Sequence, residues 1–155
     1  MAAGCFWGVQ FYFDQVPGVI KTEVGYTGGT TANPTYEQVC AHGTGHAEAV
    51  KISYDPAKVS FEMLLRQFFR MHDPTQLNRQ GPDVGDQYRS AIFYRDERQK
   101  QIAEQLIAEL NKAQYSGKIV TKLEPAGKFW LAEAYHQKFS QRTGLGICHV
   151  SYAPV

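Results

Sequence analysis

The sequence predicts an α+β fold in which two layers form a split βαβ arrangement, followed by a long irregular C-terminal tail. Three observations support this. Segments with helix and strand patterns alternate in the order helix, strand, strand, helix, strand, helix, strand. No internal repeat, linker or low-complexity block divides the chain. A length of 155 residues suits one compact domain with a real core. We therefore expect residues 1–155 to form a single domain, with a tail from about residue 140 to 155.

The first helix is expected from Cys5 to Gln15, because Phe6, Val9 and Phe13 recur at helical spacing and Val16-Pro17-Gly18 ends the run. A split βαβ fold normally begins with a strand, and only Met1-Ala2-Ala3 is available for it. A strand is then expected at 20–26. Its alternation places four residues on one face: Ile20, Thr22, Val24 and Tyr26.

Residues 25–34 contain three glycines, three threonines, an asparagine and a proline, so we expect a loop there. The next strand, 47–54, places Glu48, Val50, Ile52 and Tyr54 on one face and ends at Asp55-Pro56. Ser60 is suited to cap a helix. The apolar stripe of that helix has the i, i+3, i+4, i+7, i+8 spacing and consists of Phe61, Leu64, Leu65, Phe68 and Phe69.

In the second half, a long polar stretch covers residues 73–85, and a strand is expected at 89–95. Residues 97–114 carry Ile102, Leu106, Ile107 and Leu110 at helical spacing, with Gly117 as a stop. A further strand is expected at 119–124 and a short helix within 128–139. The tail from Ser140 is rich in glycine and has no clear period.

Composition excludes several classes of function. The net charge is +1 without a basic run, which gives no electrostatic footprint for nucleic acid or for an anionic membrane. No apolar stretch approaches the roughly 20 residues of a membrane span, and the start lacks a signal-peptide pattern. The three cysteines, Cys5, Cys40 and Cys148, form no CxxC and suit a reducing compartment. We expect a soluble, cytoplasmic protein.

Cys5 is the first candidate for chemistry. The segment Gly4-Cys5-Phe6-Trp7-Gly8 places a thiol between two glycines and beside two large aromatic residues. In the first turn of a helix, unpaired backbone N–H groups and the positive dipole end favour thiolate. Such a position can lower a cysteine pKa from about 8.5 into the range of about 3.5–7.5. The alternative is a buried structural cysteine at a helix start.

Glu48 is the second candidate. It shares a strand face with Val50 and Ile52, so its carboxyl is expected to be desolvated and its pKa raised, which would let it donate a proton near neutral pH. An exposed glutamate at the end of a strand is the alternative. Tyr36, Asp83 and Tyr88 could add polar contacts, although tyrosines often pack in cores and a turn aspartate usually serves the turn.

Two other sites compete for these residues. Cys40, His42 and His46 could ligate zinc, and His46-Ala47-Glu48 fits half of a zinc deaminase signature, but the P-C-x-x-C half is absent. A Cys-His hydrolase would use Cys5 as nucleophile, His46 or His136 as base, and Asp83 to orient the base. A hydrolase mechanism has no role for Cys148, whereas a redox cycle would use it as a second thiol.

Three motifs together resemble the A-type peptide methionine sulfoxide reductases. They are Gly4-Cys5-Phe6-Trp7-Gly8, Gly45-His46-Ala47-Glu48-Ala49-Val50, and the segment from Gly81 to Ser90. The resemblance continues through Pro125-Ala126-Gly127 and His136-Gln137, over nearly the whole chain. It implies a ferredoxin-like α+β sandwich forming a single catalytic domain.

The resemblance also implies roles for the residues. Cys5 matches the nucleophile, Glu48 the acid, and Phe6 and Trp7 the aromatic pair that receives the S-methyl group. Tyr36, Asp83 and Tyr88 match residues that hold the sulfoxide oxygen or an ordered water. The implied substrate is methionine-S-sulfoxide, free or in oxidised proteins, and the implied role is protein repair.

The implied cycle produces a Cys5 sulfenic acid, which condenses with Cys148, the resolving thiol of the tail. Thioredoxin then reduces the Cys5–Cys148 disulfide. No metal or organic cofactor is expected, and the protein is expected to be a monomer. Pro82 and Ala41-His42 depart from the family pattern in loops, and no recycling cysteine follows Cys148. Cys40 is expected to be structural, or else an alternative resolving thiol.

Overall fold

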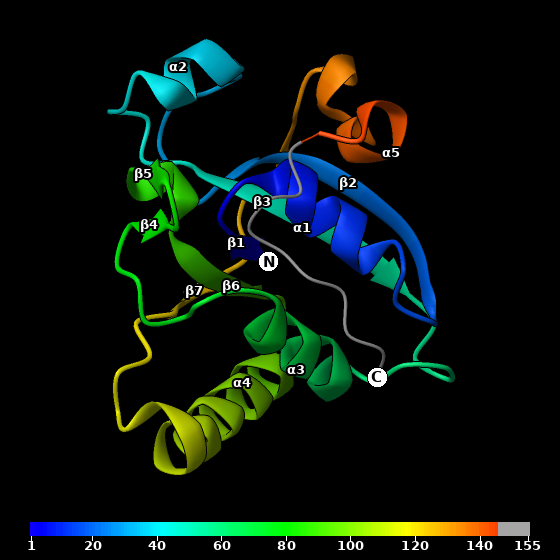
Figure 1. Ribbon diagram of the computed structural model, residues 1–155, viewed down its shortest axis with the longest axis vertical. Helices are drawn as coiled ribbons and strands as arrows, with labels where there is room; N and C mark the ends of the chain where they lie inside the picture. The colour runs from blue at the N-terminus through cyan, green and yellow to red at the C-terminus, as the bar shows by residue number, and fades with distance from the viewer. Residues whose placement is uncertain (146–155) are drawn as a thin grey trace.

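The computed structural model describes residues 1–145 and has a mixed α/β fold with small sheets and, within that range, five α-helices (Figure 1). The strands are β1 (Ala2–Ala3), β2 (Val19–Thr27), β3 (Ala47–Tyr54), β4 (Arg79–Gln80), β5 (Asp83–Val84), β6 (Ser90–Tyr94), β7 (Lys122–Pro125) and β8 (Trp130–Leu131). The α-helices are α1 (Phe6–Phe13), α2 (Tyr36–Cys40), α3 (Phe61–Met71), α4 (Glu97–Leu110) and α5 (Phe139–Thr143). One π-helical turn (Asn111–Tyr115) and two 3₁₀ turns (Asp86–Tyr88 and Ala134–His136) complete the described elements.

Two three-stranded sheets carry the site, with strand orders β1-β6-β7 and β3-β2-β8. β2 and β3 form a long antiparallel pair in which Tyr26 lies opposite Glu48. The two sheets meet at the start of the chain, where Met1 and Val50 exchange two backbone hydrogen bonds of 2.8 and 2.9 Å. β1 pairs with β6 in one sheet, and the Met1–Val50 hydrogen bonds place it beside β3 of the other sheet.

The helices pack according to their apolar patterns. Ser60 caps α3, because its hydroxyl accepts the backbone N–H of Met63 at 3.1 Å, and the predicted stripe faces the core, where Leu64, Leu65, Phe68 and Phe69 are buried. α1 contacts β2 and β3, and α4 lies beside α3 and contacts β6 (Figure 1). The core between these helices and the strands that they contact contains five fully buried aromatic residues: Phe6, Tyr12, Phe13, Tyr26 and Phe68.

The C-terminal segment returns to the first helix. β8 pairs with β2 at Gly25 and Tyr26, and α5 contacts α1 (Figure 1). This return brings residues 133–139 next to the start of α1, more than 120 positions away in the sequence.

Some expectations need correction. Ile20 does not share the buried face with Thr22, Val24 and Tyr26; it is 71 % exposed, because the β2–β3 register shifts between Val19 and Lys21. The strand expected at 119–124 begins later, at Lys122.

Other elements were not expected. α2 follows the predicted loop, and the polar stretch contains the β4–β5 hairpin. The short helix expected within 128–139 is a 3₁₀ turn preceded by β8. Within residues 1–145, no helix has the length and apolar character needed to cross a bilayer.

Candidate active site

Cys5 immediately precedes α1 and is half-buried. The backbone N–H groups of Trp7 and Gly8, in the first turn of α1, hydrogen-bond to its sulfur. Gly4 has a φ of +93°, in the left-handed region that a glycine adopts at little cost. The glycine before the cysteine therefore allows the chain to turn from β1 into α1 and to present the thiol at the helix start.

The acidity of Cys5 differs from the sequence-based expectation. Burial raises the pKa of the thiol well above its ordinary value, and the neighbouring carboxyls of Glu48 and then Asp83 raise it further. The two helix N–H groups oppose this rise but are the weaker effect. The expectation of a pKa lowered by the helix start is therefore wrong for the substrate-free site, and the resting thiol is protonated.

Glu48 lies on β3 and is 1 % exposed. One carboxyl oxygen, Oε1, accepts the backbone N–H of Phe6 at 3.2 Å, while Oε2 is buried and has no hydrogen-bond partner among residues 1–145. Burial raises the pKa of Glu48 to about 8, more than the Phe6 N–H lowers it, with a smaller contribution from Asp83. The alternation of β3 therefore predicted both the burial and the raised pKa.

Tyr36, Asp83 and Tyr88 reach the same place from α2, β5 and the 3₁₀ turn, and all three are half-buried. Burial and then the Glu48 carboxyl raise the pKa of both tyrosines, so both hydroxyls remain protonated donors. Tyr88 also interacts electrostatically with Asp83 and Cys5. Polar groups from three elements thus lie near Cys5 and Glu48.

Phe6 and Trp7 form an aromatic wall beside the thiol. Phe6 is fully buried, whereas Trp7 is partly exposed. The Phe6 ring centroid is 5.7 Å from that of Tyr26 and 6.4 Å from that of Tyr36, and the Trp7 and Tyr36 rings stack at 6.3 Å. The structure thus brings together all seven candidate residues in its described range; Cys148 lies outside that range.

Neither rival arrangement is formed. His46 uses both ring nitrogens in the preceding loop, with Gly29 N–H at 3.0 Å and the Thr31 carbonyl at 2.7 Å. His136 accepts the indole N–H of Trp7, and neither histidine is among the groups that shift the pKa of Cys5. In the part of the chain described, no three His, Cys, Asp or Glu side chains group as metal ligands.

Several neighbours of the site were not singled out from the sequence. Glu133 accepts the Tyr26 hydroxyl at 2.9 Å and the Tyr36 backbone N–H at 3.0 Å, joining β2, α2 and the C-terminal segment. Cys40 has a side-chain hydrogen bond with Tyr36. These contacts join residues up to 107 positions apart, so no local sequence pattern signals them. In the sequence, only the family resemblance at His136-Gln137 pointed to this region.

Comparison with known proteins gives consistent matches. The sequence model of the family described as "Peptide methionine sulfoxide reductase" matches residues 1–155. A peptide methionine sulfoxide reductase MsrA of Acidobacterium capsulatum is 50 % identical over 149 residues, 96 % of each chain.

Solved structures agree. Mxr1 of Saccharomyces cerevisiae in reduced form has a TM-score of 0.85 and 35 % identity, covering 94 % of this chain and 84 % of that one. Methionine sulfoxide reductase A of Corynebacterium diphtheriae has a TM-score of 0.81 and 37 % identity, covering 97 % and 80 %. Mxr1 has also been solved in complex with Trx2; in that structure it shares the fold at a TM-score of 0.62 and 24 % identity, covering 99 % and 86 %.

Proposed function

The chain belongs to the peptide methionine sulfoxide reductase family, and from this premise we propose how its residues reduce the sulfoxide. The enzyme reduces methionine sulfoxide to methionine. One observation carries the assignment of roles: a buried carboxyl of pKa about 8, with one oxygen that has no partner among the described residues, lies close enough to the Cys5 thiol to raise the pKa of that thiol. This arrangement supports the assignment of Glu48 as proton donor and Cys5 as nucleophile, the pair that sulfoxide reduction requires.

Substrate binding uses the aromatic wall and the polar groups. The S-methyl group lies against Phe6 and Trp7, and the sulfoxide oxygen accepts hydrogen bonds from protonated Glu48 and from the hydroxyls of Tyr36 and Tyr88. Asp83 accepts a hydrogen bond from a water that in turn donates to this oxygen. Because the hydrogen bonds withdraw electrons from the sulfoxide, they make its sulfur more electrophilic and stabilise the nearby thiolate. A thiol that rests protonated is therefore activated only when substrate is present.

Chemistry then proceeds without an added co-reactant. Cys5 Sγ attacks the substrate sulfur, Glu48 gives its proton to the oxygen, and the thiol proton passes to the Glu48 carboxylate. The sulfur–oxygen bond of the substrate breaks as the hydroxyl passes to Cys5, which leaves methionine and a Cys5 sulfenic acid. Cys5 is oxidised by two electrons and the substrate sulfur is reduced by two.

Regeneration uses Cys148 and a dithiol. The Cys148 thiol condenses with the sulfenic acid, which releases water and forms a Cys5–Cys148 disulfide, and thioredoxin reduces this disulfide by exchange. The solved complex of the related Mxr1 with Trx2 supports this partner. We propose methionine-S-sulfoxide, free or in proteins, as the substrate, and residues 1–155 as one catalytic domain whose tail carries the resolving cysteine.

We also infer that the fold is a ferredoxin-like sandwich. The two hydrogen bonds between Met1 and Val50 join the two sheets across β1 and β3. The resulting central order β6-β1-β3-β2, with α1 following β1 and α3 following β3, supports a split βαβ unit.

The test is turnover with separated epimers. Thioredoxin-coupled NADPH oxidation is expected with the S epimer of methionine sulfoxide and not with the R epimer; absence of turnover with both would refute the proposal. Cys148→Ser should complete one turnover but not recycle with thioredoxin, with Cys40→Ser as the matched control that keeps recycling. If Cys40→Ser stops recycling and Cys148→Ser does not, Cys40 is the resolving thiol.

Counting free thiols separates reduction from the hydrolase alternative and from simple binding. One equivalent of methionine sulfoxide should remove two thiols per chain and release one methionine. A Cys-His hydrolase would instead turn over an ester or amide with no loss of thiols, and a binding protein would neither lose thiols nor release product.

A further inference from the structure

Among residues 1–145, His136 is the one fully buried histidine in contact with the aromatic wall, and the mechanism above gives it no role. It ends the 3₁₀ turn that precedes α5 and is 0 % exposed. Its Nδ1 accepts the indole N–H of Trp7 at 2.8 Å across 129 positions. Because Nδ1 accepts, the neutral imidazole carries its proton on Nε2. Burial lowers the pKa of His136, although Glu133 opposes this, so the accepting form is the one present at neutral pH.

A second contact acts on the same indole. Phe139 stacks on Trp7 with ring centroids 3.9 Å apart and an interplanar angle of 20°. The hydrogen bond thus fixes the nitrogen edge of the indole, and the stack fixes one face of it. Trp7 itself is only partly buried and packs against the outside of the core, so these two contacts contribute to fixing the orientation of its indole.

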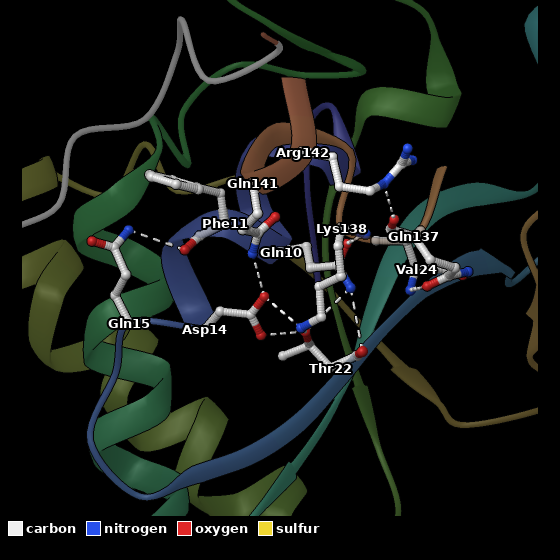
Figure 2. A network of polar contacts seen from close by, with 10 residues as sticks. All are labelled: Gln10, Phe11, Asp14, Gln15, Thr22, Val24, Gln137, Lys138, Gln141 and Arg142. Carbon is white, nitrogen blue, oxygen red and sulfur yellow. Dashed lines mark hydrogen bonds and ion pairs between the residues drawn. The ribbon is translucent and has the colours of Figure 1, made fainter. Parts of the chain in front are cut away.

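The turn that carries His136 is tied to β2 and α1 by the two residues that follow it. The Gln137 amide exchanges hydrogen bonds of 2.9 and 3.0 Å with the backbone of Val24, as a neighbouring strand would (Figure 2). The Lys138 backbone N–H donates to the side chain of buried Gln10 at 2.7 Å, and its ammonium lies 2.6 Å from Asp14 (Figure 2). Gln141 and Thr22 also bind Asp14 (Figure 2).

We propose that His136 is a positioning residue for sulfoxide reduction, which holds the Trp7 indole at the angle of a methyl-binding wall while Gln137 and Lys138 fix His136 against α1. The inference rests on the proposed function, because that function makes Trp7 part of the substrate pocket. The inference further implies that the substrate pocket is built from residues near both ends of the described chain, Trp7 and His136. Loss of the Trp7 bond should therefore weaken substrate binding more than it slows the chemical step.

The experiment compares two replacements of His136 in a Trp130→Phe background, where Trp7 is the sole tryptophan. His136→Asn keeps an acceptor near the position of Nδ1, whereas His136→Phe keeps a ring without one. Loss of one hydrogen bond corresponds to about a 3- to 10-fold effect. We expect His136→Phe to raise KM for the S-sulfoxide by about that factor with kcat little changed, and to lower the fluorescence anisotropy of Trp7. His136→Asn should restore both values.

Equal behaviour of the Asn and Phe variants in both measurements overturns the proposal, as does a fall in kcat with unchanged KM. The anisotropy measurement needs no substrate and therefore tests the positioning role even if the parent enzyme is inactive. Inactivity of the parent enzyme would refute the proposed function alone. Should His136→Phe melt before assay, Lys138→Met provides the second variant, with exposed Lys118→Met as its control. Unchanged anisotropy and KM in folded Lys138→Met would then overturn the anchoring of His136 through the Lys138–Asp14 ion pair.

Discussion

At the scale of single residues, Glu48 should determine how the reduction step depends on pH. Its pKa of about 8 means that the carboxyl is protonated at neutral pH and loses its proton above pH 8. Because only the protonated acid can donate, kcat/KM from single-turnover measurements should be flat below pH 8 and should fall about tenfold per pH unit above it.

The Glu48→Gln variant keeps the shape of the side chain but has no acidic proton. Its reduction rate should be lower by about 10²- to 10⁴-fold, the usual contribution of a general acid. The decrease above pH 8 should disappear as well. A normal single-turnover rate in this variant would remove Glu48 from the role of acid.

The same carboxyl should make the free energy of unfolding depend on pH. The folded pKa of about 8 lies above the ordinary 4.5, so the contribution of Glu48 to stability is fully present below pH 4.5 and is lost as the pH rises to 8. At about 1.4 kcal/mol per pH unit, the loss is on the order of 5 kcal/mol. Urea unfolding should show Glu48→Gln to be more stable than the parent at pH 8 and nearly equal to it at pH 4.5; an equal difference at both pH values contradicts this.

Glu48 and Cys5 show what a sequence reveals about single residues. The burial of Glu48 follows from strand alternation, which is a local pattern. The acidity of Cys5 does not, because the argument from the helix start counts only the N–H groups nearby in the sequence. Burial of the thiol and a carboxyl 43 positions away outweigh them, and both depend on tertiary packing.

At the scale of elements, weakening α2 should affect substrate binding more than the stability of the whole protein. Thr35 and Gln38 form a capping box at its start, with hydrogen bonds of 3.2 and 3.0 Å. The helix buries only Val39 but carries Tyr36. Thr35→Ala removes a cap of about 1 kcal/mol. We expect KM to rise severalfold with little change in Tm, because α2 can loosen without exposing the core.

Ser60→Ala is the matched control, since Ser60 caps α3, whose apolar face is part of the core. It should lower the free energy of unfolding by about 1 kcal/mol and leave KM unchanged. Steady-state kinetics and thermal melting of both variants give the comparison. The reverse pattern, with KM altered by Ser60→Ala and Tm by Thr35→Ala, would show that α2 has no separate role.

The same two helices mark the limit of prediction for elements. The stripe of α3 has a strong period over two turns, so the start of the helix at Ser60 and its apolar face were predicted correctly. α2 is five residues long, too short for a period, and its capping box lies at the end of a loop rich in glycine and threonine. The β4–β5 hairpin, with two residues per strand, is equally invisible to pattern analysis.

At the scale of the whole molecule, the order of helices and strands predicted a mixed fold of helices and sheets, but not how the C-terminal segment closes the site. That closure depends on polar contacts such as Glu133 with Tyr26 and Gln137 with Val24, which join residues more than 100 positions apart. No period or motif encodes such pairs. Prediction from the sequence therefore succeeds for the mixed fold and for the convergence of the named motifs, and misses the contacts by which the C-terminal segment completes the pocket.

Gly25 should control this closure, because it lies where β8 crosses β2. A Cβ there would come within 2.4 Å of the Trp130 carbonyl oxygen and 2.5 Å of the Phe129 ring. Gly25→Ala should therefore push β8 off β2, at a cost of about 1–3 kcal/mol for overpacking. Because the segment 129–143 depends on β8 and on polar contacts for its attachment, hydrogen exchange should rise there more than in α3 and α4.

Gly127→Ala is the matched control in the adjoining loop, where an added Cβ meets no atom within 4 Å among the described residues. It should change the free energy of unfolding by no more than about 0.5 kcal/mol and leave exchange unaltered. Gly25→Ala should also raise KM, because the support of Trp7 by His136 and Phe139 moves with β8. If exchange in Gly25→Ala rises uniformly across the chain, the segment is not a separate unit, and the pocket closes only as part of global folding.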